Sequence, residues 1–307
     1  MPPISVDPFS ATQEPAGTPW YEELDSDPVP VDFAAMVEGR APEPGQPAAP
    51  TEETVRQALS GGRPTVPPAP ELTLELPRGY TANGITHTTV EVRELTGADE
   101  EYLARYKTDE TVFDAIIALA VQRIGTIDLS NQPVSESSRI LGTLLIGERL
   151  MIFLKVIEVT FGNEKEMRYT CGSCGEEQDI TVLINEDFQI NVPENLQMVY
   201  DFALSSGKVV KYRLLVGADV LAISENAKAT VAQTNTAMLS RIIVSVDGET
   251  PLDMADFVRK LSIGDRERLL KDVAQNQPDV ALSLSLTCLS CHEEVQAPVT
   301  WGQLFRV

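Results

Sequence analysis

The chain has 307 residues, of which 43% are hydrophobic, so it holds enough apolar material for one or two packed cores. Its net charge is −22, from 24 basic and 46 acidic residues. Such a surface repels the phosphates of nucleic acids and anionic membranes, and no apolar run approaches the ~20 residues that span a bilayer. Binding of nucleic acid and insertion into a membrane are therefore not expected.

The first 70 residues differ in composition from the rest of the chain. They contain 15 of the 21 prolines and carry 11 acidic against 3 basic residues. Proline fixes φ and removes a backbone donor, so residues 1–70 are predicted to be a disordered-like, extended acidic tail. One hypothesis is that the tail docks on neighbouring subunits, and a solvated acidic linker is an equally good interpretation of the composition. The anchors for docking would be Trp20, Tyr21, Phe33, Met36 and Leu59.

A first body segment is predicted over residues 71–162. Alternating residues predict strands at 72–77 and 86–95, with turn chemistry at Asn83-Gly84 between them. Thr96 followed by Asp99 is typical of a helix start, and Thr108 begins a second helix that would end at Gly125. The longest apolar helix is predicted over residues 136–160. Because it is apolar around most of its circumference, it should be buried in the body or in an intersubunit seam.

The remaining residues, 163–307, are predicted to carry two cysteine hairpins with a helical insertion between them. Ser205-Ser-Gly-Lys208 indicates another hairpin, and helices are expected at roughly 217–246 and 252–274. Ser262 with Asp265 marks an N-cap and a break inside the second of these helices. Both halves of the body follow the order strands, helices, cysteine hairpin, without an evident residue-for-residue repeat. The predicted fold class is α+β, built from short strand hairpins and helices.

The four cysteines of the chain form two Cys-x-x-Cys knuckles. Each knuckle aims two thiolates at one point, and two knuckles complete the four-coordination of a tetrahedral zinc site. Each knuckle lies between two segments whose sequence pattern predicts β-strands, which is the hairpin context of a zinc ribbon. The 113 residues between the knuckles would make the metal join the middle of the chain to its C-terminal end. The predicted ligands are Cys171, Cys174, Cys288 and Cys291.

Other interpretations of these cysteines stay open. The knuckles are also compatible with unmetallated turns whose small thiols are simply buried. Cys288-Leu-Ser-Cys291-His292 fits the haem-attachment string, but Gly175 follows the first knuckle where that string needs histidine. A thioredoxin-like redox pair would require a knuckle at a helix start, and disulfide staples would require an oxidising compartment.

Catalytic constellations are not apparent in the sequence. His87 and His292 are the two histidines, which limits acid–base schemes, and the phosphate-loop, HExxH and GxSxG motifs are missing. Acidic runs such as residues 99–101 are typical of a solvated face in so acidic a chain. We therefore expect neither enzymatic activity nor a small-molecule substrate.

Four segments of the body, taken in their order, resemble a known family. They are the entry Leu76-Pro-Arg-Gly-Tyr, the passage from Val90 through Arg93-Glu-Leu-Thr-Gly-Ala-Asp-Glu-Glu101, the knuckle Tyr169-Thr-Cys-Gly-Ser-Cys-Gly, and a final Cys-x-x-Cys hairpin that closes on Leu304-Phe-Arg. Over residues 71–307 the chain resembles the T-even-type bacteriophage baseplate hub and tail assembly proteins.

This resemblance implies a structural role in the virion. The protein would be made in the host cytoplasm and would act in a contractile tail baseplate, as part of the hub or wedge, with structural Zn²⁺ on the four cysteines. Its partners would be other tail proteins and copies of itself. One alternative is a cellular zinc-ribbon adaptor acting between proteins, since the knuckles are flanked by acidic and not basic residues. A thiol-based redox enzyme is a further alternative.

Overall fold

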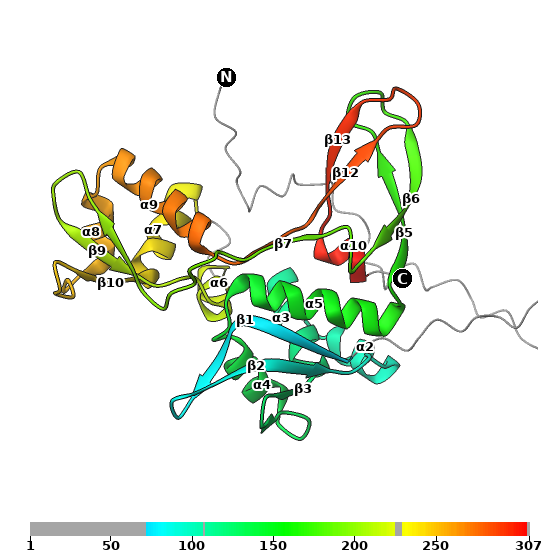
Figure 1. Ribbon diagram of the computed structural model, residues 1–307, viewed down its shortest axis with the longest axis horizontal. Helices are drawn as coiled ribbons and strands as arrows, with labels where there is room; N and C mark the ends of the chain where they lie inside the picture. Colours follow the sequence, from blue (N-terminus) through cyan, green and yellow to red (C-terminus); the bar gives the residue numbers. More distant parts are fainter. Residues whose placement is uncertain (1–71, 107, 225–228, 306–307) are drawn as a thin grey trace, which may run out of the picture. The chain divides into compact units, whose positions relative to one another are not determined.

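The computed structural model describes residues 72–106, 108–224 and 229–305. The predicted tail, residues 1–70, lies outside these ranges together with its proposed anchors. Residues Pro68–Val307 form one compact unit, and the predicted border between residues 162 and 163 inside it stays a prediction. The described part of this unit mixes helices with small antiparallel sheets, so the predicted α+β class is confirmed (Figure 1).

The first half of the unit runs from a strand hairpin through helices to the first cysteine hairpin. Strands β1 to β4 form one sheet in that order. The elements are β1 (Thr73–Ala82), β2 (Ile85–Val92), α2 (Gly97–Leu103), α3 (Asp109–Ala120), β3 (Val121–Ile124), β4 (Ile127–Asp128), α4 (Val134–Leu141), α5 (Ile146–Phe161), β5 (Glu164–Thr170) and β6 (Glu177–Leu183).

The second half begins after a short linking strand and ends with the second cysteine hairpin. Its three-stranded sheet has the order β10-β9-β8, and β11 pairs with the linking strand β7. The elements are β7 (Gln189–Asn191), β8 (Tyr200–Ala203), β9 (Val209–Tyr212), α6 (Gly217–Ser224), α7 (Val231–Ile242), β10 (Ile243–Val246), α8 (Met254–Lys260), α9 (Ile263–Asn276), β11 (Asp279–Ala281), β12 (Ser283–Thr287), β13 (Glu294–Pro298) and α10 (Trp301–Phe305).

Two apolar cores hold these elements. The first core packs α3 and α5 against the β1–β4 sheet, and Val182 of β6, Leu284 of β12 and Ala297 of β13 belong to it. Both cysteine hairpins are therefore anchored in the first core, although the second hairpin follows the second half of the chain. The second core gathers residues of the β8–β10 sheet, α7, α8 and α9, with Tyr212 and Leu239 fully buried.

Several local predictions are confirmed by the backbone. Asn83 and Gly84 have φ of 52° and 76°, the left-handed values of a tight hairpin turn, and they join β1 to β2. The hairpin predicted around Ser205 joins β8 to β9. Thr96 precedes α2 with Asp99 in a capping box, and the side chain of Ser262 accepts the backbone N–H of Asp265 at the start of α9.

Three predicted helices are too long. The helix predicted over 136–160 is two helices, because the chain turns at Gly142 and restarts at Leu145, whose N–H donates to the carboxylate of Glu148. The helix expected to reach Gly125 ends at Ala120, since residues 121–124 pair with β2 as strand β3. Residues 217–246 likewise divide into α6, α7 and strand β10, which pairs with β9.

The two halves repeat each other at the level of residues, which the sequence analysis did not find. Both contain Arg-x-Leu-x-Gly-Ala-Asp, at 93–99 and 213–219, just after a strand hairpin. Both contain Leu-x-Ile-Gly-(Glu/Asp)-Arg, at 144–149 and 261–266, at the start of α5 and α9. Both end in Thr-Cys-x-Ser-Cys-x-Glu-Glu, at 170–177 and 287–294. The body is therefore an internal duplication.

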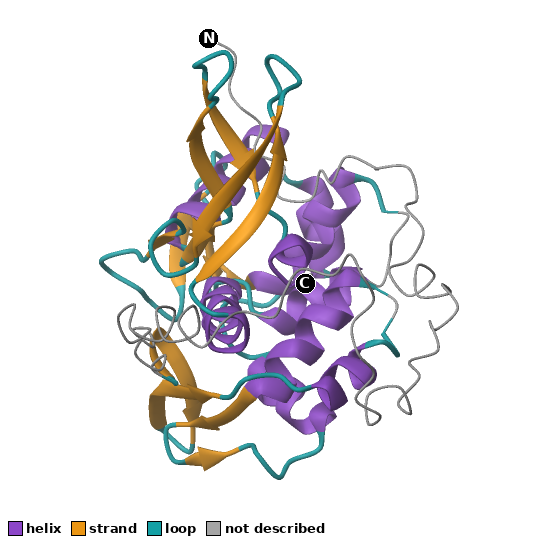
Figure 2. Ribbon diagram, turned by 90° about the vertical axis from the view of Figure 1, so that its right-hand side faces the viewer, coloured by secondary structure: helices purple, strands orange, loops and turns teal. Residues whose placement is uncertain are grey.

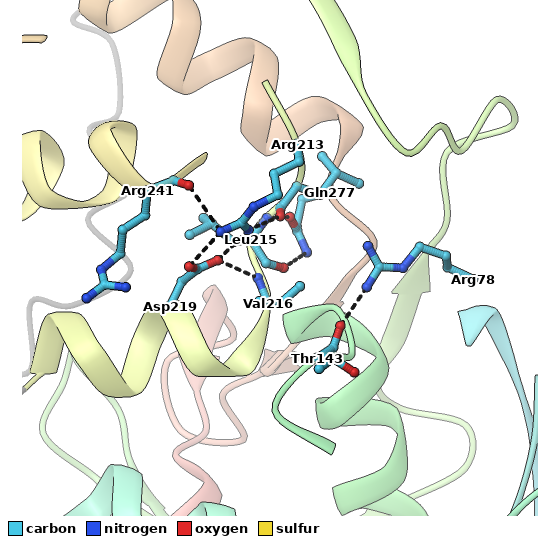
Figure 3. Close-up of polar contacts among 9 residues, drawn as sticks. Arg78, Thr143, Arg213, Leu215, Val216, Asp219, Arg241 and Gln277 are labelled. Carbon is cyan, nitrogen blue, oxygen red and sulfur yellow. Dashed lines mark hydrogen bonds and ion pairs between the residues drawn. The ribbon is translucent and has the colours of Figure 1, made fainter. Parts of the chain in front are cut away.

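The first shared motif makes the same contacts in each half. Arg93 holds Asp99 through two hydrogen bonds of 2.7 and 2.8 Å, and its backbone N–H donates to the carbonyl of Ala120 at 2.9 Å. In the second half, Arg213 holds Asp219 at 2.6 and 2.9 Å (Figure 3). The backbone N–H of Arg213 donates to the carbonyl of Ile242, also at 2.9 Å. Each arginine thus clamps the start of one helix to the end of the next.

The second shared motif places a buried carboxylate at the third position of a helix. Glu148 of α5 accepts the backbone N–H groups of Arg78 and Gly79 in β1, both at 2.6 Å. Asp265 of α9 accepts the N–H and the hydroxyl of Ser205, at 2.9 and 2.8 Å, next to β8. In each half this carboxylate ties the first strand hairpin to the helix that precedes the cysteine knuckle.

The Arg93–Asp99 clamp yields a stability prediction for Asp99→Asn. The hydrogen bond from Arg93 is the largest of the effects that lower the pKa of Asp99, to about 2. A carboxyl of an unfolded chain titrates near pH ~4, so the ionised group contributes about 2 kcal/mol to the free energy of unfolding at neutral pH. Asp99→Asn should remove this contribution. Because the folded-state pKa is the lower one, this contribution is lost as the pH falls from about 4 to about 2. Urea titrations of both proteins measure the difference.

Glu91→Gln is the matched control, because its ion pair with Arg123 spans 3.6 Å between side chains that are 41% and 54% exposed. It should change the free energy of unfolding by less than about 0.5 kcal/mol. A deficit of Asp99→Asn that stays constant down to pH ~2 would contradict an electrostatic origin.

Candidate metal centre

The cysteines lie in the turns of two matching strand hairpins. Strands β5 and β6 pair in register up to Thr170 opposite Glu177, and β12 and β13 pair up to Thr287 opposite Glu294. Six residues bridge each pair of strand ends. The two hairpins come from different halves of the chain and lie side by side (Figure 2).

Both turns have the same backbone hydrogen bonds. In the first knuckle, the N–H of Cys171 donates to the carbonyl of Glu176, and the N–H of Gly175 donates to the carbonyl of Cys171, both at 2.8 Å. In the second, the matching bonds run from Cys288 to Glu293 at 3.0 Å and from His292 to Cys288 at 2.9 Å. The backbone of each turn therefore folds around the first cysteine.

The residue after each second cysteine has a left-handed backbone. Gly175 has φ of 76° and His292 has φ of 59°. Glycine adopts this conformation freely, whereas a residue with a Cβ pays roughly 1–2 kcal/mol. The second knuckle bears this cost at His292.

The two turns bring all four sulfur atoms together. They lie within 4.8 Å of one another, with 3.9 Å between Cys171 and Cys291 and 3.7 Å between Cys174 and Cys288. Four thiolates at ~2.3 Å from a zinc ion, arranged as a tetrahedron, are about 3.8 Å apart. The donor set and its spacing therefore fit one tetrahedrally coordinated, thiophilic metal ion.

The arrangement of the sulfurs is nearly symmetric. The first cysteine of each knuckle lies next to the second cysteine of the other knuckle. Cys171 and Cys288 are buried, each 1% exposed, while Cys174 and Cys291 are exposed. None of the four is in a disulfide. Each half of the duplication thus contributes one buried and one exposed thiol.

Hydrogen-bond donors around Cys288 favour the thiolate form of this residue. The backbone N–H groups of Cys291 and Ser290 lower the pKa of Cys288 to about 6. The side-chain amide of Gln178 donates to the Cys288 sulfur at 3.1 Å, and its oxygen accepts the N–H of Leu289 at 2.9 Å. Donors of this kind fix the orientation of a metal ligand and stabilise its charged form.

Gln178 was missed by the sequence analysis. It lies on β6, and in the duplication its place in the second hairpin is taken by Val295, so nothing in the local pattern distinguishes it. Its role follows only from the contact between the two knuckles.

The geometry bears on the other interpretations of the cysteines. Each knuckle follows a strand and precedes a strand, so neither lies at the helix start that a thioredoxin-like pair requires. Among the described residues, the cluster of possible metal ligands contains only the four cysteines, and both histidines lie outside it. The carboxylates predicted around the knuckles form an exposed acidic rim, consisting of Glu176, Glu177, Asp179, Glu293 and Glu294.

In the described part, none of the helices combines the length and the apolar character needed to cross a membrane.

Comparison with known proteins identifies the family of the chain. No significant match exists among curated proteins or among solved structures. The family model described as T4 bacteriophage base plate protein matches residues 69–302, which include both halves of the duplication and all four cysteines. The chain therefore belongs to the T4 bacteriophage base plate protein family.

Proposed function

We propose that the protein is a structural component of the hub or wedge of a contractile tail baseplate, stabilised by one zinc ion on its four cysteines. The family match supports the baseplate role and a location in the virion tail. The observation that carries the zinc proposal is the cluster of four thiols within 4.8 Å, drawn from knuckles 113 residues apart. The protein would be made in the host cytoplasm and would act without catalysis.

Zinc would serve this role by adding folding energy. A two-stranded hairpin is marginally stable in water by itself, and the chain presents two of them with their turns at the cysteines. Coordination by thiolates would join the two turns and would hold the left-handed backbone of His292. A structural site of this kind has four protein ligands and no open position for a substrate.

The partners would be other tail proteins and copies of this chain. With a net charge of −22, the protein is suited to contacts with proteins that present basic surfaces and not to nucleic acid. The acidic rim around the knuckles extends this character to the metal centre.

The zinc proposal predicts the metal content of the protein. Purified under reducing conditions without a chelator, it should contain one zinc per chain, measured by inductively coupled plasma mass spectrometry. Removal of the metal with a strong chelator should lower the melting temperature, because metal binding is coupled to folding. Identical melting curves with and without metal would contradict a structural zinc.

Substitution of one ligand tests the site directly. Cys288→Ser should abolish stoichiometric zinc binding and lower the free energy of unfolding by several kcal/mol, because it removes a ligand whose binding energy is also folding energy. Ser290→Ala is the matched control, because this exposed side chain lies in the same turn and its backbone stays in place. Equal zinc content in Cys288→Ser and wild type would show that the four cysteines do not share a metal.

The composition of purified particles tests the baseplate role. Mass spectrometry of virions should detect the protein in intact tails, at a constant ratio to the other baseplate proteins. A cellular adaptor or a redox enzyme with the same cysteine cluster would be abundant in infected cells and missing from particles. That result would contradict the structural role while leaving the zinc site intact.

A further inference from the structure

A backbone contact joins the second half of the duplication to the first. Val216 forms an antiparallel bridge with Leu145, which lies in the connection between α4 and α5. The N–H of Ala218 donates to the carbonyl of Gly142, in the same connection, at 2.8 Å. Pairing of this kind depends on the backbone conformation of the two segments more than on their side chains.

The contact requires a glycine at its centre. A Cβ added to Gly217 would lie 2.0 Å from Nη1 of Arg149 and 2.6 Å from its Cδ. The side chain of Arg149 is held in place, because it is buried and ion-paired with Asp114. Leu221, from the second half, lines the same hollow as Asp114. Arg149 therefore lies at the border of the two halves, with its carboxylate partner in its own half.

The internal contact joins two different surfaces, so the duplication leaves one further copy of each. The docking surface, residues 215–221, corresponds to residues 95–101 of the first half. The receiving surface, residues 142–149, corresponds to residues 259–266 of the second half. A contact between two different surfaces can be repeated from one molecule to the next, which gives rings or filaments.

Both of these further surfaces are uncovered in the described part of the chain. Gly97, the counterpart of Gly217, is exposed, and a Cβ added to it would meet no atom within 4 Å. Ser262, the counterpart of Leu145, is exposed and takes part in none of the bridges between described residues. Each surface thus has the backbone of the internal contact without its partner.

Arg266 corresponds to Arg149, but among the described residues it has no ion pair. Its Nη2 donates to the hydroxyl of Thr236 at 2.9 Å. Thr236 is the sixth residue of α7, as Asp114 is of α3, so a hydroxyl takes the place of the carboxylate. Arg266 is half-buried, and the second half supplies hydrogen bonds to it without a compensating charge.

The other uncovered surface carries a carboxylate that matches this cation. Glu101 lies two residues after Asp99, in the place that Leu221 occupies after Asp219, and it is exposed. Docked as its counterpart is, Glu101 lies near Arg266. The ion pair that the first half makes within itself is then formed between two copies.

The remaining exposed charges near the α8–α9 connection have both signs. Arg259 and Glu267 are exposed, and Lys260 is ion-paired with Asp256 at 2.5 Å. They give no preference for an acidic or a basic partner. The choice of occupant rests instead on the backbone pairing, the glycine and Glu101.

We propose that residues 95–101 of one copy bind residues 259–266 of a second copy, in the way that α6 binds the α4–α5 connection within the chain. Gly97 lies against Arg266 in this contact, and Glu101 pairs with its guanidinium. The inference rests on the proposed assembly role and specifies how copies of the chain associate, head to tail.

Sedimentation velocity of the full-length protein over a range of concentrations tests the contact. The sedimentation coefficient of wild type should rise with concentration. Gly97→Ala should weaken association about tenfold, because the added Cβ meets Arg266 of the neighbouring copy. Gly302→Ala is the matched control, since Gly302 in α10 also has no atom within 4 Å of an added Cβ, and it should associate like wild type.

A charge exchange tests the pairing of the two surfaces. Glu101→Arg and Arg266→Glu should each weaken association about tenfold, since each places like charges together. An equal mixture of the two variants should recover association, because each offers the intact surface that the other lacks. Glu166→Arg is the control for the change in net charge, because Glu166 is exposed on β5, and it should have no effect.

The substitutions at Gly97 and Glu101 change exposed positions, so both variants should keep the zinc content and melting temperature of wild type. A wild-type protein that stays monomeric at every concentration would overturn the proposal. So would variants that associate like wild type, or a mixture that fails to recover association. Zinc content and virion composition are measured separately, so failure of this contact is distinguishable from failure of the proposed function.

Discussion

The structure depends on how two isolated strand hairpins are kept in place. Neither β5–β6 nor β12–β13 pairs with a further strand among the described residues, and a lone two-stranded hairpin has little stability in water. Their bases are held by the first core, where Val182, Leu284 and Ala297 are buried. Their turns meet at four sulfur atoms and at Gln178. A metal ion at the sulfurs would therefore complete a structure that packing supports at one end.

The duplication is preserved in polar contacts more than in apolar ones. Arginine–carboxylate clamps and buried helix carboxylates need specific atoms at specific distances, whereas apolar positions accept any side chain of suitable volume. Helices α5 and α9 illustrate this difference. Leu154 is buried in α5, while Lys271 occupies the corresponding place in α9 and is exposed. Helix α5 packs against α3, β1, β2, β5 and β11, so its apolar face differs from that of α9.

Features that depend on short stretches of sequence were predicted correctly. The strand hairpins around the two knuckles, the turn at Asn83-Gly84 and the N-cap at Ser262 each require only a few neighbouring residues. Features that depend on a partner elsewhere in the chain were not. Residues 121–124 continue the apolar pattern of α3, yet they form a strand because β2 offers an unpaired edge. The sequence analysis did not recognise the repeat because its motifs are separated by 120 residues in one case and by 117 in the others, and because the segments between the motifs differ in length.

The location of the cysteines relative to the duplication has a consequence for folding. Each half supplies one knuckle, so neither half alone can offer four ligands to a metal. The first knuckle is synthesised long before the second, and Cys288 and Cys291 lie near the C-terminal end of the chain. A site with four thiols can form only after both halves are made. Closing this loop carries an entropic cost, which coordination of a metal by four thiolates would help to offset. Metal binding at this position would thus favour the complete, correctly paired chain over every partial fold of it.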